Sequence, residues 1–298
     1  MIRKVDYTMH SACLAAVVTI GDAIIYLPSE YRGEAMLPGF LIASAAAVLI
    51  FLASHFLCVY SSGGAICKKV LFTVLALILS VYALRSGAHC LLVFAGFADK
   101  ILLPDGGKFI AAFIFLFTAA VLSLKNRIVL LKLSLIAAPL IAVSAVLFLL
   151  LTAKDLEADN IAIGSFLHFK ELYGGAAYFF SEISLPAALI PPYFVINEKK
   201  PRLSAGLAGL CAGLAVTAAA CTVSVLLFGA RMSARLPFPL AGAVSTVTVG
   251  PLFTRMDWIV YGVFFISAVI KAAFCSRLCF GLIKELSQIG RASCRERV

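Results

Sequence analysis

Eight apolar stretches of membrane-spanning length constrain the fold of this chain more than any other feature of its sequence. A helix that crosses a bilayer needs about 20 apolar residues, within a range of roughly 17–25. Hydrophobic residues make up 62% of the chain and charged residues 13%, whereas soluble domains average about 45–50% and about 25%. We therefore expect an all-α integral membrane protein, with spans at residues 9–28, 37–60, 70–97, 109–124, 128–151, 173–197, 203–228 and 258–283.

The sixth stretch, YGGAAYFFSEISLPAALIPPYFVIN at 173–197, carries a carboxylate in its middle and several helix breakers. A charge such as Glu182 at the centre of a spanning helix costs at least ~2.5 kcal/mol, so it is expected to face the protein interior. Pro186 and the pair at 191–192 each remove a backbone donor. A broken helix that holds an acid at mid-membrane is typical of secondary transporter sites. The alternative is a kinked helix whose Glu182 pairs with a neighbouring cation.

The first stretch has a similar design, with Thr19, Ile20, Gly21 and Asp22 at a weak point and Pro28 downstream. The two broken stretches lie five spans apart, as expected of two five-helix units that repeat with opposite orientation. A chance pair of kinks is the alternative. We predict a mid-membrane binding site between broken helices one and six, built from Thr19, Gly21, Asp22, Gly175, Phe180, Ser181 and Glu182, with Pro28 and Pro186 in structural roles.

The chemistry of opened helices suits a zwitterion. N–H groups at a half-helix start attract a carboxylate, and carbonyls at a half-helix end attract an ammonium group or an ion. Glu182 or Asp22 could bind the ammonium group or carry a coupling proton. Alternatively, Arg85 or Lys271, which lie inside apolar stretches, neutralises one of these acids, because buried charges are usually paired. His89 is expected to be a core or interface residue.

Four segments carry a resemblance to a known family: IGDAIIYLP at 20–28, ALRSGAH at 83–89, FFSEISLPAALIPPY at 179–193 and FTRMDWIVYGVFFISAVIK at 253–271. They resemble the spore germination permease family, which supplies the B subunit of endospore germinant receptors and belongs to the amino acid-polyamine-organocation superfamily. The most telling residues are Glu182, Arg255, Asp257 and Lys271. The resemblance runs over nearly all of 9–286 and implies a ten-helix, LeuT-like inverted-repeat bundle. On this resemblance we expect the chain to supply about eight of those helices as one domain, 1–288, truncated before helices nine and ten.

The resemblance also implies a function. It predicts a permease-like subunit, not an enzyme, that binds an amino acid or similar small germinant in the spore inner membrane. Other germinant receptor subunits would be its partners. Two alternatives remain open: a proton-coupled amino-acid transporter, and a membrane scaffold without a small ligand.

Charged residues near the ends of the stretches set the remaining expectations. The tight Lys and Arg clusters fall on one side, which favours a cytoplasmic amino terminus and accounts for much of the net charge of +10 without nucleic acid. Arg255 and Asp257 are expected to form a local salt bridge that caps the eighth span. The last ten residues, IGRASCRERV at 289–298, resemble translated sequencing adapter and are expected to be non-native. Phosphate-binding and zinc-peptidase motifs are missing, so we predict neither catalytic nor metal-binding residues, and no cofactor.

Overall fold

The computed structural model describes residues 7–21, 36–61, 66–102, 107–157, 169–197, 203–236, 238–246 and 257–295. All regular structure within these ranges is helical, which confirms the expected all-α architecture for this part of the chain. The helices in chain order are α1 (Tyr7–Ile20), α2 (Met36–Ser61), α3 (Ile66–Phe97), η2 (Ala98–Leu102), α4 (Lys108–Leu124), α5 (Arg127–Thr152), α6 (Phe169–Phe179), η5 (Phe180–Ser184), α7 (Leu185–Ala187), α8 (Ile190–Asn197), α9 (Leu203–Arg235), α10 (Pro239–Thr246) and α11 (Asp257–Arg295).

Each predicted stretch overlaps at least one helix, but the helices differ in length. Among the described residues, five are long and apolar enough to cross a membrane, in α2, α3, α5, α9 and α11, with 24 to 31 residues each. At 1.5 Å per residue, even the shortest is about 36 Å long and exceeds the ~30 Å hydrocarbon core. The first and fourth stretches form shorter helices of 14 and 17 residues, and the sixth is divided.

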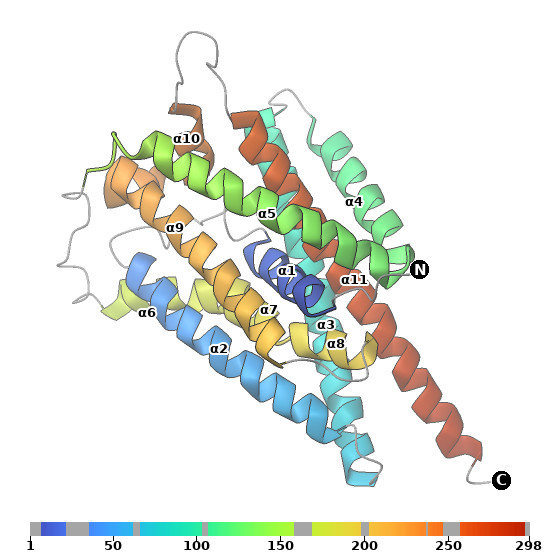
Figure 1. Cartoon of the computed structure of the whole chain (residues 1–298). Helices are drawn as coiled ribbons and strands as arrows, with labels where there is room; N and C mark the ends of the chain where they lie inside the picture. The colour runs from blue at the N-terminus through green and yellow to red at the C-terminus, as the bar shows by residue number, and fades with distance from the viewer. Residues whose placement is uncertain are drawn as a thin grey trace.

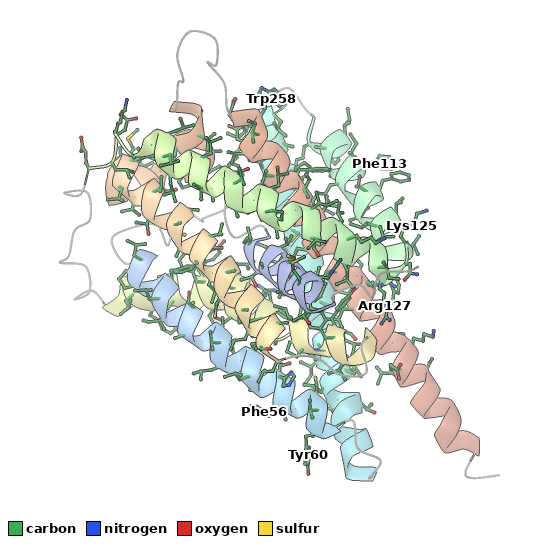
Figure 2. All side chains as sticks on the ribbon, in the orientation of Figure 1. Phe56, Tyr60, Phe113, Lys125, Arg127 and Trp258 are labelled. Atoms are coloured by element: carbon green, nitrogen blue, oxygen red, sulfur yellow. The ribbon has the colours of Figure 1, made fainter. Side chains whose placement is uncertain are left out.

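The side chains are distributed as a lipid environment requires, with large apolar groups on the outside. On α4, Phe109, Phe113 and Phe117 recur every four residues and are 84%, 68% and 62% exposed, and Figure 2 shows Phe113 pointing away from the bundle. The opposite face of α4, which carries Ala111 and Phe115, is buried. Exposed apolar surface of this extent marks contact with a membrane or another protein.

The short helix α1 lies in the middle of the bundle, where α5, α9 and α11 pack around it (Figure 1). Small residues on α9 allow the closest of these contacts. A methyl group added at Gly213 would lie 2.7 Å from the Thr19 Cβ atom and 2.8 Å from the Ala16 carbonyl oxygen. Glycine at such positions lets helix backbones approach closely in a bilayer.

The sequence predicts no helix between the spans 203–228 and 258–283, yet the structure has helical residues there, so this part of the prediction was wrong. Helix α9 continues to Arg235 and changes direction at Gly229, whose φ of +66° is a conformation that favours glycine. A second helix, α10, follows with Pro239 as its first residue, a position where proline's missing N–H costs little. Helix α11 also runs past the predicted end at 283, as far as Arg295.

Basic residues lie at one end of the bundle (Figure 2). Lys125 and Arg127 flank the turn between α4 and α5, at the end away from Trp258 (Figure 2). In this turn the Arg277 guanidinium of α11 donates to the carbonyls of Ser123, at 3.2 Å, and Lys125. A basic side chain therefore satisfies the open carbonyls at the end of α4.

Candidate functional site

The sixth stretch breaks into α6, η5, α7 and α8, and its prolines explain why. Pro186 has no N–H for the preceding turn, and the residues before it form the π-helix η5, in which the Leu185 N–H bonds back five residues to the Phe180 carbonyl. Pro192 cannot donate to the Ala188 carbonyl; the Ser54 hydroxyl of α2 donates to it instead, at 2.8 Å. Short π segments inside α-helices often occur at functional sites.

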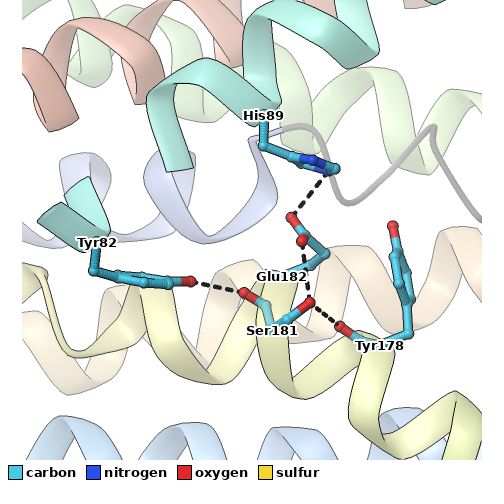
Figure 3. A network of polar contacts seen from close by, with 5 residues as sticks. All are labelled: Tyr82, His89, Tyr178, Ser181 and Glu182. Carbon is cyan, nitrogen blue, oxygen red and sulfur yellow. Dashed lines mark hydrogen bonds and ion pairs between the residues drawn. The ribbon is translucent and has the colours of Figure 1, made fainter. Parts of the chain in front are cut away.

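Glu182 lies in η5 and is buried, with 6% of its surface exposed. Its Oε2 atom is 3.2 Å from Nε2 of His89 on α3, as Figure 3 shows. The Ser181 hydroxyl lies 3.1 Å from the other carboxylate oxygen and 2.9 Å from the Tyr178 carbonyl. The prediction that Glu182 faces the interior is confirmed, and the ionisable side chain against it is an imidazole that the sequence analysis assigned to packing.

Tyr82 of α3 contacts the residue next to Glu182. Its hydroxyl donates to the Ser181 carbonyl at 2.7 Å and so ties α3 to η5 (Figure 3). The same hydroxyl lies within electrostatic range of Lys271, Glu182 and Arg85. The Arg85 guanidinium lies 5.8 Å from the centre of the Tyr82 ring, a cation–π distance. Arg85 therefore contacts a neighbour of the carboxylate rather than forming the ion pair with Glu182.

The break in α1 forms the second part of the site. Gly21 ends the helix with a φ of +38°, and its carbonyl accepts a hydrogen bond from the Ser267 hydroxyl of α11 at 3.1 Å. One turn further along α11, the Lys271 side chain runs directly over Gly21. Its Cε and Nζ atoms lie 3.2 Å from where a Gly21 Cβ would be. Lys271 is 1% exposed, so α1 ends against a fully buried lysine side chain.

The remaining predicted site residues lie in other places. Thr19 bonds to the Ala15 carbonyl at 2.8 Å within α1 and packs on α9. Gly175 is buried where α6 meets α2, since a methyl group on Gly39 would lie 2.9 Å from its carbonyl carbon. Phe180 is 39% exposed and Pro186 is buried in α7. Asp257 begins α11. Three predicted residues lie outside the described part of the chain: Asp22, Pro28 and Arg255. The predicted salt bridge between Arg255 and Asp257 therefore lies outside it as well.

A small cavity reaches the α1 break from the side of α5, α9 and α10. Its volume is about 40 Å³, and Ile20 and Ser267 form part of its wall. A cavity that holds one water molecule needs a volume of roughly 10–15 Å³, so this cavity has room for a few water-sized groups. Its other lining residues are apolar except Ser144. Among the described residues, no group of three or more His, Cys, Asp or Glu side chains could hold a metal ion.

Three polar residues of the site escaped prediction: Tyr82, His89 and Ser267. A signal for the first two was present, because Tyr82, Ser86 and His89 recur at spacings of four and three along an otherwise apolar helix. Such spacing places all three on one helix face. Comparison with known proteins adds no further assignment: no protein-family model matches the chain, and no curated protein shows significant similarity to it.

Proposed function

We propose that this protein is a multi-pass, permease-like membrane subunit that binds an amino acid or a similar small germinant. The binding site would lie between the α1 break and the η5 segment, and the bundle would be part of the ten-helix inverted-repeat class. By resemblance to the spore germination permeases, the subunit would act in the spore inner membrane with the other germinant receptor subunits. Its amino terminus would be cytoplasmic.

The observation that carries this proposal is the carboxylate of Glu182 inside a π-helix of an apolar, lipid-adapted bundle. An ionised group at this depth is costly, and such residues usually serve a ligand, an ion or a proton pathway. Here the cost is met by His89 at 3.2 Å and Ser181 at 3.1 Å. A carboxylate with such polar support can bind the ammonium group of an amino acid. Lys271, which lies within electrostatic range of Tyr82, would attract its carboxylate.

A proton-coupled amino-acid transporter is the second candidate, and the His89–Glu182 pair favours it. Both groups gain and lose protons, and chains of such groups form proton relays in membrane carriers. His89 also retains access to its surroundings, because its side chain is 27% exposed whereas that of Glu182 is 8% exposed. A membrane scaffold without a small ligand is the third candidate.

The test is a thermal-shift screen of the purified protein against the individual proteinogenic amino acids. At least one amino acid should raise the unfolding temperature of the wild type, because a ligand that binds only the folded state stabilises it. Glu182→Gln removes the charge with little change of shape and should abolish that shift. Glu157→Gln, at an exposed position outside the bundle core, is the matched control and should keep it.

The outcomes separate the three candidates. A shift that survives in Glu182→Gln would rule out the carboxylate as the ligand's anchor, and a screen without any response would favour the scaffold. Proteoliposomes then distinguish sensor from carrier. Accumulation of the responding amino acid that depends on a proton gradient supports transport, whereas binding without accumulation supports a sensory subunit.

A further inference from the structure

We propose that a groove between α5 and α9 binds one acyl chain of an anionic phospholipid from the surrounding membrane, and that Lys132 of α5 holds the phosphate of this lipid. The inference goes beyond the amino-acid site, because it concerns a different surface of the bundle and a different class of ligand. It also makes the lipid a direct neighbour of α1, the helix that ends at Ile20 before the Gly21 break.

The groove is an open channel with α1 as its floor and α5 and α9 as its walls (Figure 1). Its volume is about 630 Å³, within the range of roughly 300–1,000 Å³ that is usual for ligand pockets. The floor runs from Met9 to Ile20, which is about 16 Å at 1.5 Å per residue. The walls consist largely of small residues that leave the channel open: Ala138, Ala142, Ala208, Gly209 and Ala212.

Hydrocarbon suits this groove better than water does. The side chains that line it are apolar apart from the Cys13 thiol, and water enters a cavity only where polar groups can bind it. An empty groove would forfeit the dispersion contacts of its whole lining. The groove opens between exposed positions of α5 and α9, among them Ala142 and Ala212. Both lie within candidate membrane spans, so the material outside the groove is lipid and an acyl chain is the occupant at hand.

A positive charge lies at one end of the groove. Lys132, Leu135 and Pro139 follow one another at spacings of three and four on α5, so they share one face of that helix. Leu135 and Pro139 line the groove, and Lys132 is exposed one turn before it. Lys132 is five residues, or about 7.5 Å, from the first residue of α5. A lysine at this depth extends its ammonium group to the headgroup layer, where it attracts anionic lipid.

The opposite end of the groove lies beside the α1 break. Ile20, Ile141 and Val216 line both the groove and the small cavity at this break. With its phosphate at Lys132, the lipid would therefore direct the end of its acyl chain toward the break. Membrane composition would then act on the same helix that the proposed amino-acid site depends on.

The experiment uses the full chain in phosphatidylcholine vesicles that contain a small fraction of a phospholipid with a photoactivatable diazirine in its acyl chain. Two such probes with identical acyl chains are compared, one a phosphatidylglycerol and the other a phosphatidylcholine. Mass spectrometry then measures the label on α1 relative to that on α4, whose exposed Phe113 reports contact with bulk lipid. We expect label on α1 near Cys13 and Ala16, and more of it from phosphatidylglycerol. An unlabelled α1 beside a labelled α4 would overturn the proposal, and so would equal labelling of α1 by both probes.

Removal of the charge separates the headgroup from the acyl chain. Lys132→Gln should lower the labelling of α1 by the phosphatidylglycerol probe roughly fivefold, the effect of one lysine near an anionic lipid surface. It should leave labelling by the phosphatidylcholine probe unchanged. Lys154→Gln, at an exposed position beyond the other end of α5, is the matched control and should change neither. An equal loss with both probes in Lys132→Gln, or the same loss in Lys154→Gln, would refute the role of the charge.

A bulky side chain in the groove tests the position of the acyl chain. Ala142→Phe fills the groove from α5 and should remove the label on α1 from both probes, whereas Ala45→Phe, at an exposed position of α2, should keep it. Ala212→Phe fills the groove from α9 and replaces Ala142→Phe if that variant does not fold. Label on α1 that persists in the filled groove would contradict the proposal.

A second copy of the chain is the competing occupant of the groove. It predicts dimers in the vesicles together with an unlabelled α1, and this result would overturn the lipid site. None of these measurements uses an amino-acid ligand, so a failed ligand screen with Glu182 leaves them valid, and the reverse also holds.

Discussion

The close contact between α1 and α9 makes a sharp prediction for Gly213→Ala. In a helix interior this substitution normally stabilises by about 1 kcal/mol, through helix propensity. At Gly213 the new methyl group would lie 2.7 Å from the Thr19 Cβ atom and 2.8 Å from the Ala16 carbonyl oxygen. Neither atom is the far end of a flexible side chain, so α1 or α9 has to shift. Overpacking of this kind costs roughly 1–3 kcal/mol.

A matched control is available on α11. A methyl group added at Gly262 would meet no atom within 4 Å, so Gly262→Ala should show the propensity gain alone. The difference between the two variants is then the overpacking cost of roughly 1–3 kcal/mol. Gly213→Ala should therefore unfold about 2–12 °C below Gly262→Ala, at 2–4 °C per kcal/mol for a large chain.

The buried cysteines provide the assay. Cys58, Cys90, Cys221, Cys275 and Cys279 are buried, so a fluorogenic maleimide reports their exposure as the protein unfolds. The exposed Cys211 and the half-buried Cys13 would react before unfolding, so both are replaced by serine in every variant, together with Cys67 and Cys294. If Gly213→Ala and Gly262→Ala unfold at the same temperature, α9 does not lie as close to α1 as the structure has it, and the central position of α1 is refuted.

Three further predictions follow from other contacts. His89→Phe should destabilise the wild type more than it destabilises Glu182→Gln, with a coupling energy of roughly 0.5–3 kcal/mol in a double-mutant cycle; additive effects would show that the pair does not interact. Arg277→Ala should lower the free energy of unfolding by roughly 1.5–3 kcal/mol, which is the contribution of hydrogen bonds to a charged group. Chemical unfolding measures this; an unchanged free energy of unfolding would mean that the contacts of Arg277 with α4 contribute nothing. Cys211, exposed on the candidate span Leu203–Gly229, should react slowly with maleimides in intact membranes, because the thiolate that attacks the reagent needs water, and fast after denaturation; fast labelling in intact membranes by a membrane-impermeant maleimide would place it in water.

Sequence reasoning located the helices and the interior carboxylate because both follow from the cost of polar groups in lipid. A spanning helix needs a long apolar run, which is visible residue by residue. The interior position of Glu182 follows from the same cost. The break at Gly21 was also visible, since glycine is a weak point in any helix.

The partner of Glu182 was not predictable in the same way. His89 is far from it in the sequence, and their meeting depends on how α3 packs against η5. No local pattern encodes that register, although the polar stripe of Tyr82, Ser86 and His89 indicates which face of α3 is turned inward. Thr19 and Gly175 were assigned to the ligand site because they flank breaks; in the structure Thr19 packs on α9 and Gly175 lies in the contact between α6 and α2. The helical part of 229–257 was missed because arginines and prolines there resemble a loop.

The π-helix has a consequence for the rest of its own segment. Each residue of an α-helix adds about 100° of rotation, so the one additional residue held in a π turn shifts every later side chain by roughly that angle. Before the turn, Tyr173 is 69% exposed, whereas after it Leu189, Ile190, Tyr193 and Phe194 are all buried. The segment is therefore partly exposed before η5 and buried on every side over residues 189–194. Glu182 lies in η5, between the partly exposed part of the segment and the buried part.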